Sequence, residues 1–135
     1  MLQRALLFLL VSSLLLACSD AAGPGRGAEG TWRLHTVNGL ALPFTLPESG
    51  VDKLELTGEV ITLVPPRSLT IITTFRVTDG SNVFAESIPD KGTYAVNGST
   101  VTFTWDSDGS TSTATVSGNT MTLQDIGLTF VYHRD

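Results

Sequence analysis

The 135-residue sequence contains one cysteine, Cys18, so the chain cannot form an internal disulfide bond. Positive charge is also scarce. The sequence has 8 Lys and Arg but 13 Asp and Glu, which gives a formal net charge of -5. Nucleic-acid binding depends on Lys and Arg that displace counterions from phosphates, and attraction to an anionic membrane surface depends on the same charges. The composition therefore disfavours nucleic acid as a partner and predicts no attachment to a membrane through surface charge.

Only one long apolar run is present, from Ala5 to Leu16. It is too short and too close to the N-terminus to be a membrane-spanning helix. Arg4 precedes the run and the small residue Ala17 follows it, which is the pattern of a secretion signal that is removed after export. We therefore expect residues 1–17 to be a signal peptide. Its removal takes away Arg4 and no acidic residue, so the net charge of the remaining chain is more negative by one.

The end of this segment, Leu15-Leu16-Ala17-Cys18, resembles the lipobox of bacterial lipoproteins. The resemblance implies that Cys18 becomes an acylated N-terminus, with palmitate-type chains that anchor the protein in a membrane. Ser19 follows the cysteine where Asp would favour retention in the inner membrane, which favours the outer membrane of a bacterial cell envelope, with the domain in the periplasm or on the cell surface. The alternative is an ordinary secreted protein in which Cys18 is incidental.

Gly, Ala and Pro dominate the next segment, which lacks large apolar side chains. We therefore expect residues 18–29 to be a lipidated cysteine and a flexible linker, and residues 30–135 to form one domain. That domain is rich in short segments of alternating apolar and polar residues, separated by turn dipeptides such as Asn38-Gly39 and Asp79-Gly80. The predicted strands cover residues 31–37, 52–57, 59–64, 68–78, 82–88, 92–97, 100–106, 110–116, 120–125 and 127–134.

No segment has helical periodicity long enough for a crossover helix, so the strands are predicted to be antiparallel neighbours. Within them, one face carries the large apolar side chains, including Trp32, Tyr94 and Val96, and the other carries mostly Thr, Ser and charge. Closing eight to ten such strands into an up-and-down β-barrel removes the exposed edges. The Thr-rich outer face, seen at Thr100 and Thr102, favours a barrel in water over a barrel in lipid.

Gly30-Thr31-Trp32 resembles the motif that opens the first strand of lipocalins, and the wider run to Gly39 resembles small bacterial lipocalin-like lipoproteins. The resemblance implies that Trp32 closes one end of the barrel and that Arg134, beside the last strand, packs across it. It also implies a lipocalin-like barrel that holds a small apolar ligand. The chain departs from typical lipocalins because it is shorter and lacks a disulfide and a C-terminal helix. A barrel of this size either fills its interior or holds one small ligand.

The sequence has no motif that indicates a metal site or a catalytic site. His35 and His133 are the only histidines, and neither has Cys, Asp or Glu at metal-ligand spacing. The run from Asp106 to Gly109 begins like a calcium loop but lacks its later Gly and Glu, and a hairpin turn explains it. No motif activates a Ser or Thr as a nucleophile. We therefore expect no enzyme activity, no metal and no cofactor.

The leading functional hypothesis is a membrane-anchored, non-catalytic lipoprotein that binds or carries a small hydrophobic ligand inside the barrel. Side chains that would line such a pocket serve equally well as a solid core, and they are Phe75, Tyr94, Phe103, Trp105, Met121, Phe130 and Tyr132. The alternative is a protein-interaction, envelope-assembly or inhibitor module that contacts an envelope protein. The apolar loop over residues 38–50 suits a lid or a partner surface. Its candidate contact residues are Leu40, Leu42, Phe44 and Leu46.

Overall fold

A computed structural model describes residues 27–47 and 50–135 of the chain, so the predicted signal peptide and the lipidation site at Cys18 lie outside the described residues. The described part is all-β. Its elements are β1 (Gly30–Val37), β2 (Leu40–Ala41), β3 (Phe44–Leu46), β4 (Lys53–Val64), β5 (Ser68–Asp79), β6 (Asn82–Asn97), β7 (Thr100–Trp105), β8 (Thr111–Ser117), β9 (Thr120–Asp125) and β10 (Leu128–Arg134). Among these residues there is no helix long and apolar enough to cross a membrane.

Eight strands form a closed antiparallel up-and-down barrel, which confirms the predicted fold class. Each strand from β4 to β10 pairs with the next one along the chain, and β1 closes the ring by pairing with both β10 and β4. The short strands β2 and β3 pair with β1 and β4 at one end of the barrel, which we call the open end. The opposite end, where Trp32 is paired with Arg134, is called the closed end. Glycines at positive φ form the turns, as at Gly39 and Gly98. The turn between β9 and β10 has Gly127 at φ 77° and also holds Ile126 at φ 46°, a conformation that a β-branched residue rarely adopts.

Two predicted strand breaks are wrong. Residues 52–57 and 59–64 form the single strand β4, in which a bulge at Thr57 shifts the pairing register with β5 between Leu56 and Gly58. The extra residue reverses the inward–outward alternation, so that Leu56 and Glu59 both face the interior. The sequence pattern breaks at this point because the alternation itself changes phase.

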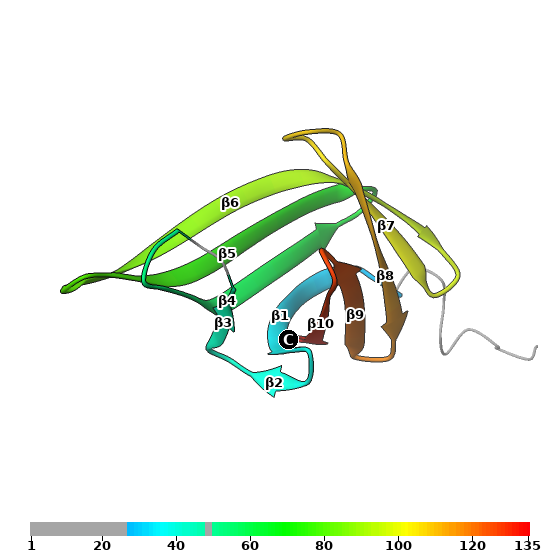
Figure 1. Ribbon diagram of the computed structural model, residues 1–135. Coiled ribbons are helices and arrows are strands. Elements are labelled where there is room, and N and C mark those ends of the chain that lie inside the picture. The colour runs from blue at the N-terminus through cyan, green and yellow to red at the C-terminus, as the bar shows by residue number, and fades with distance from the viewer. Residues whose placement is uncertain (1–26, 48–49) are drawn as a thin grey trace, which may run out of the picture.

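Residues 82–88 and 92–97 likewise form one strand, β6, which pairs through Asn82–Thr93 with the whole of β5. Pro89 is tolerated within it because β7 pairs with β6 only over Gly92–Asn97, which leaves the earlier part of β6 at an edge. The β5–β6 hairpin therefore extends well beyond β7, β8, β9 and β10. Figure 1 shows it as the long green ribbons that project to the left of the short yellow and red strands.

The closed end of the barrel is filled by side chains. The fully buried side chains of the whole interior include Trp32, Tyr132, Phe103, Ile61, Leu63, Leu69, Met121, Val37 and Val101. Ile61, Leu63 and Leu69 surround Trp32 at this end in the register of β1, β4 and β5. Val96 was expected in this core but is 43% exposed, because it lies near the end of β6, next to the turn at Gly98. In the described part of the chain, the buried core cluster runs from Ala28 to Tyr132. We therefore expect the chain from residue 19 onward to fold independently.

The packed part of the chain begins before the predicted domain start at Gly30. Ala28 is buried in the core, and its carbonyl accepts a hydrogen bond of 2.8 Å from Trp32 Nε1. The neighbouring carbonyls of Gly27 and Glu29 accept hydrogen bonds from Arg134. Composition placed these three residues in the linker because none has a large apolar side chain. Their contacts are made mainly through the backbone, which composition does not report.

Candidate functional site

The open end of the barrel holds two adjoining hollows, which together we call the mouth pocket. The inner hollow has a volume of about 240 Å³. The outer hollow has a volume of about 350 Å³. They share the lining residues Ile71, Thr73, Phe75, Trp105 and Asp125, so the two hollows lie against each other. The barrel is thus filled at the Trp32 end and hollow at the opposite end.

Apolar side chains make most of the wall of the inner hollow. They are Leu46, Leu56, Ile71, Phe75, Trp105, Leu123, Ile126 and Phe130. They come from six different strands and from the β9–β10 turn, so the space is enclosed by the barrel. A hollow of this composition suits an apolar group with a few polar contacts.

Trp105 ends β7 at the boundary between the two hollows. Its indole Nε1 donates a hydrogen bond of 3.0 Å to Ser112 Oγ on β8, and its ring lies 5.9 Å from that of the buried Phe103. The hydrogen bond satisfies the polar edge of the ring, and the apolar remainder lines both hollows. The side chain is therefore held in place before any ligand enters.

A carboxyl group forms the polar floor of the inner hollow. Glu59 lies opposite Thr73 in the β4–β5 register, and Thr73 Oγ1 donates a hydrogen bond of 2.7 Å to Glu59 Oε2. The hydroxyl of Tyr132, on β10, donates a short hydrogen bond to Glu59 Oε1. Glu59 therefore links three strands across the interior and satisfies a phenol that is otherwise surrounded by apolar core.

The same surroundings disfavour the charged form of this carboxyl. Burial raises the pKa of Glu59 above its ordinary value, and the nearby negative charge of Asp125 raises it further, against the lowering effect of the hydrogen bonds from Tyr132 and Thr73. Burial also raises the pKa of Tyr132 well above its ordinary value, and the charge of Glu59 adds to that shift. The pair therefore retains its protons to higher pH than the same groups in water.

Glu59→Gln is expected to stabilise the protein progressively as pH rises. Because the folded-state pKa of Glu59 lies above its unfolded value, the stability gained from protonation is complete below the ordinary pKa of 4.5 and is lost as pH rises through the folded value. Glutamine cannot ionise and avoids that loss. Urea unfolding at pH 4 and pH 8 measures the difference, which should be small at pH 4 and should favour the variant at pH 8.

Glu55 on the outer face of β4 provides the opposite control. Lys53 and Arg76 contact its carboxylate at 2.9 and 2.7 Å, and hydrogen bonds from Lys53 and then Arg76 lower its pKa. Glu55→Gln should therefore destabilise the protein at pH 8, and the loss should fade as pH falls through the folded pKa. The account of Glu59 is wrong if the two variants change in parallel with pH.

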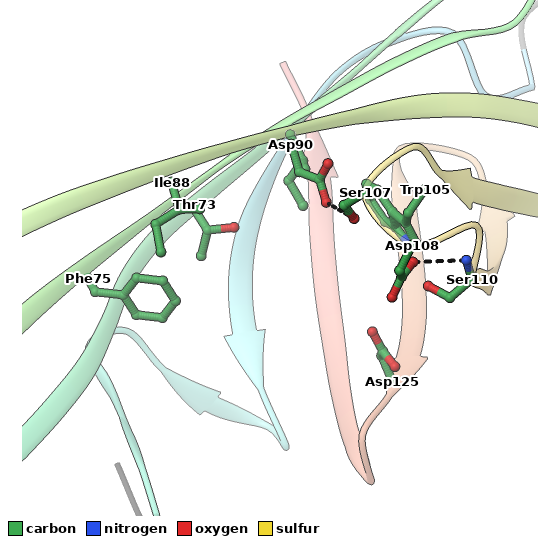
Figure 2. Close-up of a pocket in the computed structure, with 10 residues that line it drawn as sticks. Thr73, Phe75, Ile88, Asp90, Trp105, Ser107, Asp108, Ser110 and Asp125 are labelled. Atoms are coloured by element: carbon green, nitrogen blue, oxygen red, sulfur yellow. Dashed lines mark hydrogen bonds between the residues drawn. The ribbon is translucent and has the colours of Figure 1, made fainter. Parts of the chain in front are cut away.

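Three aspartates line the rim of the outer hollow, and Figure 2 shows Asp108 and Asp125 across from Phe75 and Thr73, with Asp90 between the two groups. Asp90 accepts a hydrogen bond of 3.2 Å from Ser107 Oγ, and Asp108 accepts one of 2.9 Å from the backbone N–H of Ser110. The interactions with Ser110 lower the pKa of Asp108. The third, Asp125, ends β9 and lines both hollows.

The residues predicted to line a ligand site divide into two groups. Phe75, Trp105 and Phe130 line the mouth pocket. The others belong to the buried core that fills the barrel, and they are Tyr94, Phe103, Met121 and Tyr132. Of these, Tyr132 reaches the pocket through its hydrogen bond to Glu59.

The loop predicted as a lid or partner surface lies beside the same pocket. Leu46, on β3, lines the inner hollow, and Leu42 and Phe44 pack against the core. Leu40, the first residue of β2, is 60% exposed. Most of the apolar side chains in this segment therefore face the barrel.

Arg134 and Trp32 meet at the closed end. The guanidinium carbon of Arg134 lies 4.3 Å from the centroid of the Trp32 ring, within cation–π range. Its Nη1 and Nη2 donate hydrogen bonds of 2.7 and 2.9 Å to the carbonyls of Glu29 and Gly27. This contact seals the end of the barrel opposite the mouth pocket.

The two histidines are neighbours on the outer face, which their separation in sequence does not indicate. The rings of His35 and His133 are stacked with centroids 4.3 Å apart, because β1 pairs with β10. Within residues 27–47 and 50–135, no group of three or more His, Cys, Asp or Glu is placed to hold a metal ion.

The sequence prediction missed Glu59 and Thr73 on the floor of the pocket. Glu59 shares its face with Ile61 and Leu63 at a spacing of two, and Thr73 shares its face with Ile71 and Phe75. That alternation was the available signal. Apolar residues alone define the predicted inner face, so polar side chains on that face are not identified by it.

Comparison with known proteins assigns the chain to no family. No protein-family model matches the sequence, and no curated protein matches it. The resemblance to lipocalins is thus supported at the level of architecture, a closed barrel of eight antiparallel strands, and no further.

Proposed function

We propose that this protein binds a small, largely apolar molecule in the mouth pocket, without catalysis. The observation that carries the proposal is the pair of adjoining hollows at one end of a barrel whose other end is packed solid. Apolar walls supply binding energy through burial, and the small number of polar groups at Glu59 and Thr73 supplies orientation. The architecture agrees with a lipocalin-like carrier, which is the finer identity that we propose.

The pocket fits a ligand of limited size. The inner hollow of about 240 Å³ has room for a short alkyl chain or one or two rings, and the outer hollow gives access to solvent. Leu46 and Phe75 line this inner hollow together with Glu59. A long fatty acid would leave most of its chain outside the barrel.

Titration with 1-octanol tests this function through the two tryptophans. Trp105 lines the pocket and Trp32 is buried at the closed end, so octanol should change the fluorescence of Trp105 alone. We expect a saturable change in the chain from residue 19 onward that is lost in Trp105→Phe, while calorimetry shows that the variant still binds octanol. Absence of saturable binding by calorimetry in the unsubstituted chain would contradict the proposal.

The alternative function, a protein-interaction module, has one observation in its favour. Phe84 and Ile88 on the projecting part of β6 are 52% and 47% exposed, where β7 does not pair with that strand. Crosslinking from position 84 in cells separates the two functions. A single envelope protein captured there, together with no octanol binding, would support the interaction module.

We also propose that the barrel is tethered to a bacterial envelope membrane through acylated Cys18, most simply the outer membrane. The support is the lipobox-like sequence Leu15-Leu16-Ala17-Cys18. Cells labelled with radioactive palmitate should incorporate label into the protein, and Cys18→Ser should abolish labelling and release the protein from the membrane fraction. Labelling that persists in the Cys18→Ser variant would contradict the assignment.

A further inference from the structure

The charges around the mouth pocket are of one sign. The titratable side chains that line its two hollows are Glu59, Asp90, Asp108 and Asp125, and among the described residues no Lys, Arg or His lines either hollow. Carboxyl groups from β4, β6, β9 and the β7–β8 turn therefore meet around one opening.

The described basic side chains lie elsewhere. Arg33 pairs with Asp135 at 2.8 Å, and Lys53 and Arg76 both pair with Glu55 on the outer face of the sheet. Lys91 lines an outer surface depression with Ile72, Pro89 and the rim residue Asp90. Arg67 lies in the turn between β4 and β5, and Arg134 packs on Trp32 at the closed end. The negative charge of the mouth pocket is therefore not neutralised by a basic side chain in its lining.

The rim and the floor differ in what they offer a ligand. Asp108 is exposed, and its interactions with Ser110 favour the ionised form, while Asp125 sits at the boundary of the two hollows. Glu59 on the floor already accepts hydrogen bonds from Tyr132 and Thr73. A positive group would keep part of its hydration at the rim and would gain attraction there, whereas at the floor it would lose its hydration.

We propose that the mouth pocket selects an organic cation, with an apolar body against Phe75, Leu123 and Phe130 and an ammonium group at the rim between Asp108 and Asp125. This inference rests on the proposed function and adds the chemical class of the ligand. The apolar wall and the acidic rim lie about one opening, as Figure 2 shows for Phe75 and the two aspartates. An apolar anion would bring its charge to the same rim and be repelled.

A matched set of octyl compounds tests the inference by calorimetry at pH 7 and low salt. Octylammonium, 1-octanol and nonanoate share one eight-carbon alkyl chain and carry a positive, a neutral and a negative head group. We expect octylammonium to bind about tenfold more tightly than octanol, and nonanoate about tenfold more weakly, as expected for a partly exposed charge-assisted contact. High salt should reduce both ratios, because salt screens exposed charges.

Isosteric variants assign the preference to the rim. Asp108→Asn keeps an oxygen that can accept the hydrogen bond from Ser110, and Asp125→Asn changes charge alone. Each should lower the ratio of octylammonium to octanol affinity by about threefold. Asp79→Asn, at the distant tip of the β5–β6 hairpin, makes the same change in net charge and should leave the ratio unchanged.

The outcomes separate this inference from the proposed function. If octanol binds and octylammonium binds no more tightly, the inference is overturned and the proposed function stands. If none of the three compounds binds, both are overturned. If the preference for octylammonium is present but survives in both rim variants, the assignment to Asp108 and Asp125 is wrong.

Discussion

Trp32→Ala is expected to reduce the free energy of unfolding by about 4 kcal/mol, as for other deletions of a large, fully buried aromatic side chain. The indole fills the closed end of the barrel and donates a hydrogen bond to the Ala28 carbonyl. Its ring also packs against the guanidinium group of Arg134. Its loss opens a cavity in the part of the barrel that has no access to solvent. Urea unfolding followed by circular dichroism measures the change.

Trp105→Ala is the matched control for this substitution. Trp105 is only partly buried at the mouth pocket, so part of its surface is already exposed to the hollow. We expect a clearly smaller loss of stability, since the space left behind joins an existing opening. Equal losses for the two variants would show that the barrel is not packed solidly at one end and hollow at the other.

Gly92→Ala is expected to destabilise the barrel by about 3 kcal/mol, at the upper end of the usual cost of overpacking. A Cβ atom at this position would lie 2.0 Å from the carbonyl oxygen of Thr104, so the backbones of β6 and β7 would have to separate. Gly92 is the first residue of β6 that pairs with β7, and its partner is Trp105 at the end of β7. The part of β6 before Gly92 belongs to the projecting hairpin. Urea unfolding measures the effect.

Gly58→Ala tests whether the effect is steric. Gly58 also lies within a strand, but no atom lies within 4 Å of a Cβ built there, and its φ is not positive. We expect a change of about 1 kcal/mol or less in either direction. A similar large loss in both variants would point to backbone flexibility and against the close contact with Thr104.

Local chemistry accounts for most of what the sequence predicted. Alternation within strands and glycine turns such as Asn97-Gly98 specify antiparallel neighbours, and edge removal favours closure of the barrel. The two predicted strand breaks are wrong because pairing with neighbouring strands determines whether each strand continues, and local sequence does not show that pairing. The bulge at Thr57 changes the phase of the alternation, and Pro89 is harmless only because the adjacent edge of β6 is unpaired by β7.

The mouth pocket depends on longer-range geometry. Trp105 and Asp125 end β7 and β9, and strands that alternate in direction bring these two ends to the same opening. The extension of the β5–β6 hairpin, which carries Phe75 and Ile88 beside the opening, depends on how many residues β7 pairs with. Sequence periodicity reports which face a residue occupies. It does not report how far each strand extends past its neighbour.

The two indole N–H groups provide the most direct test of ligand binding at the open end. Trp32 Nε1 donates a hydrogen bond to Ala28 at the closed end, and Trp105 Nε1 donates one to Ser112 at the mouth pocket. A nitrogen–proton correlation spectrum of the chain from residue 19 onward should therefore contain one indole signal from each end of the barrel. On titration with octylammonium, the Trp105 indole signal should shift to saturation while the Trp32 signal stays in place. A shift of Trp32 without Trp105, or no shift of either, would contradict a ligand site in the mouth pocket.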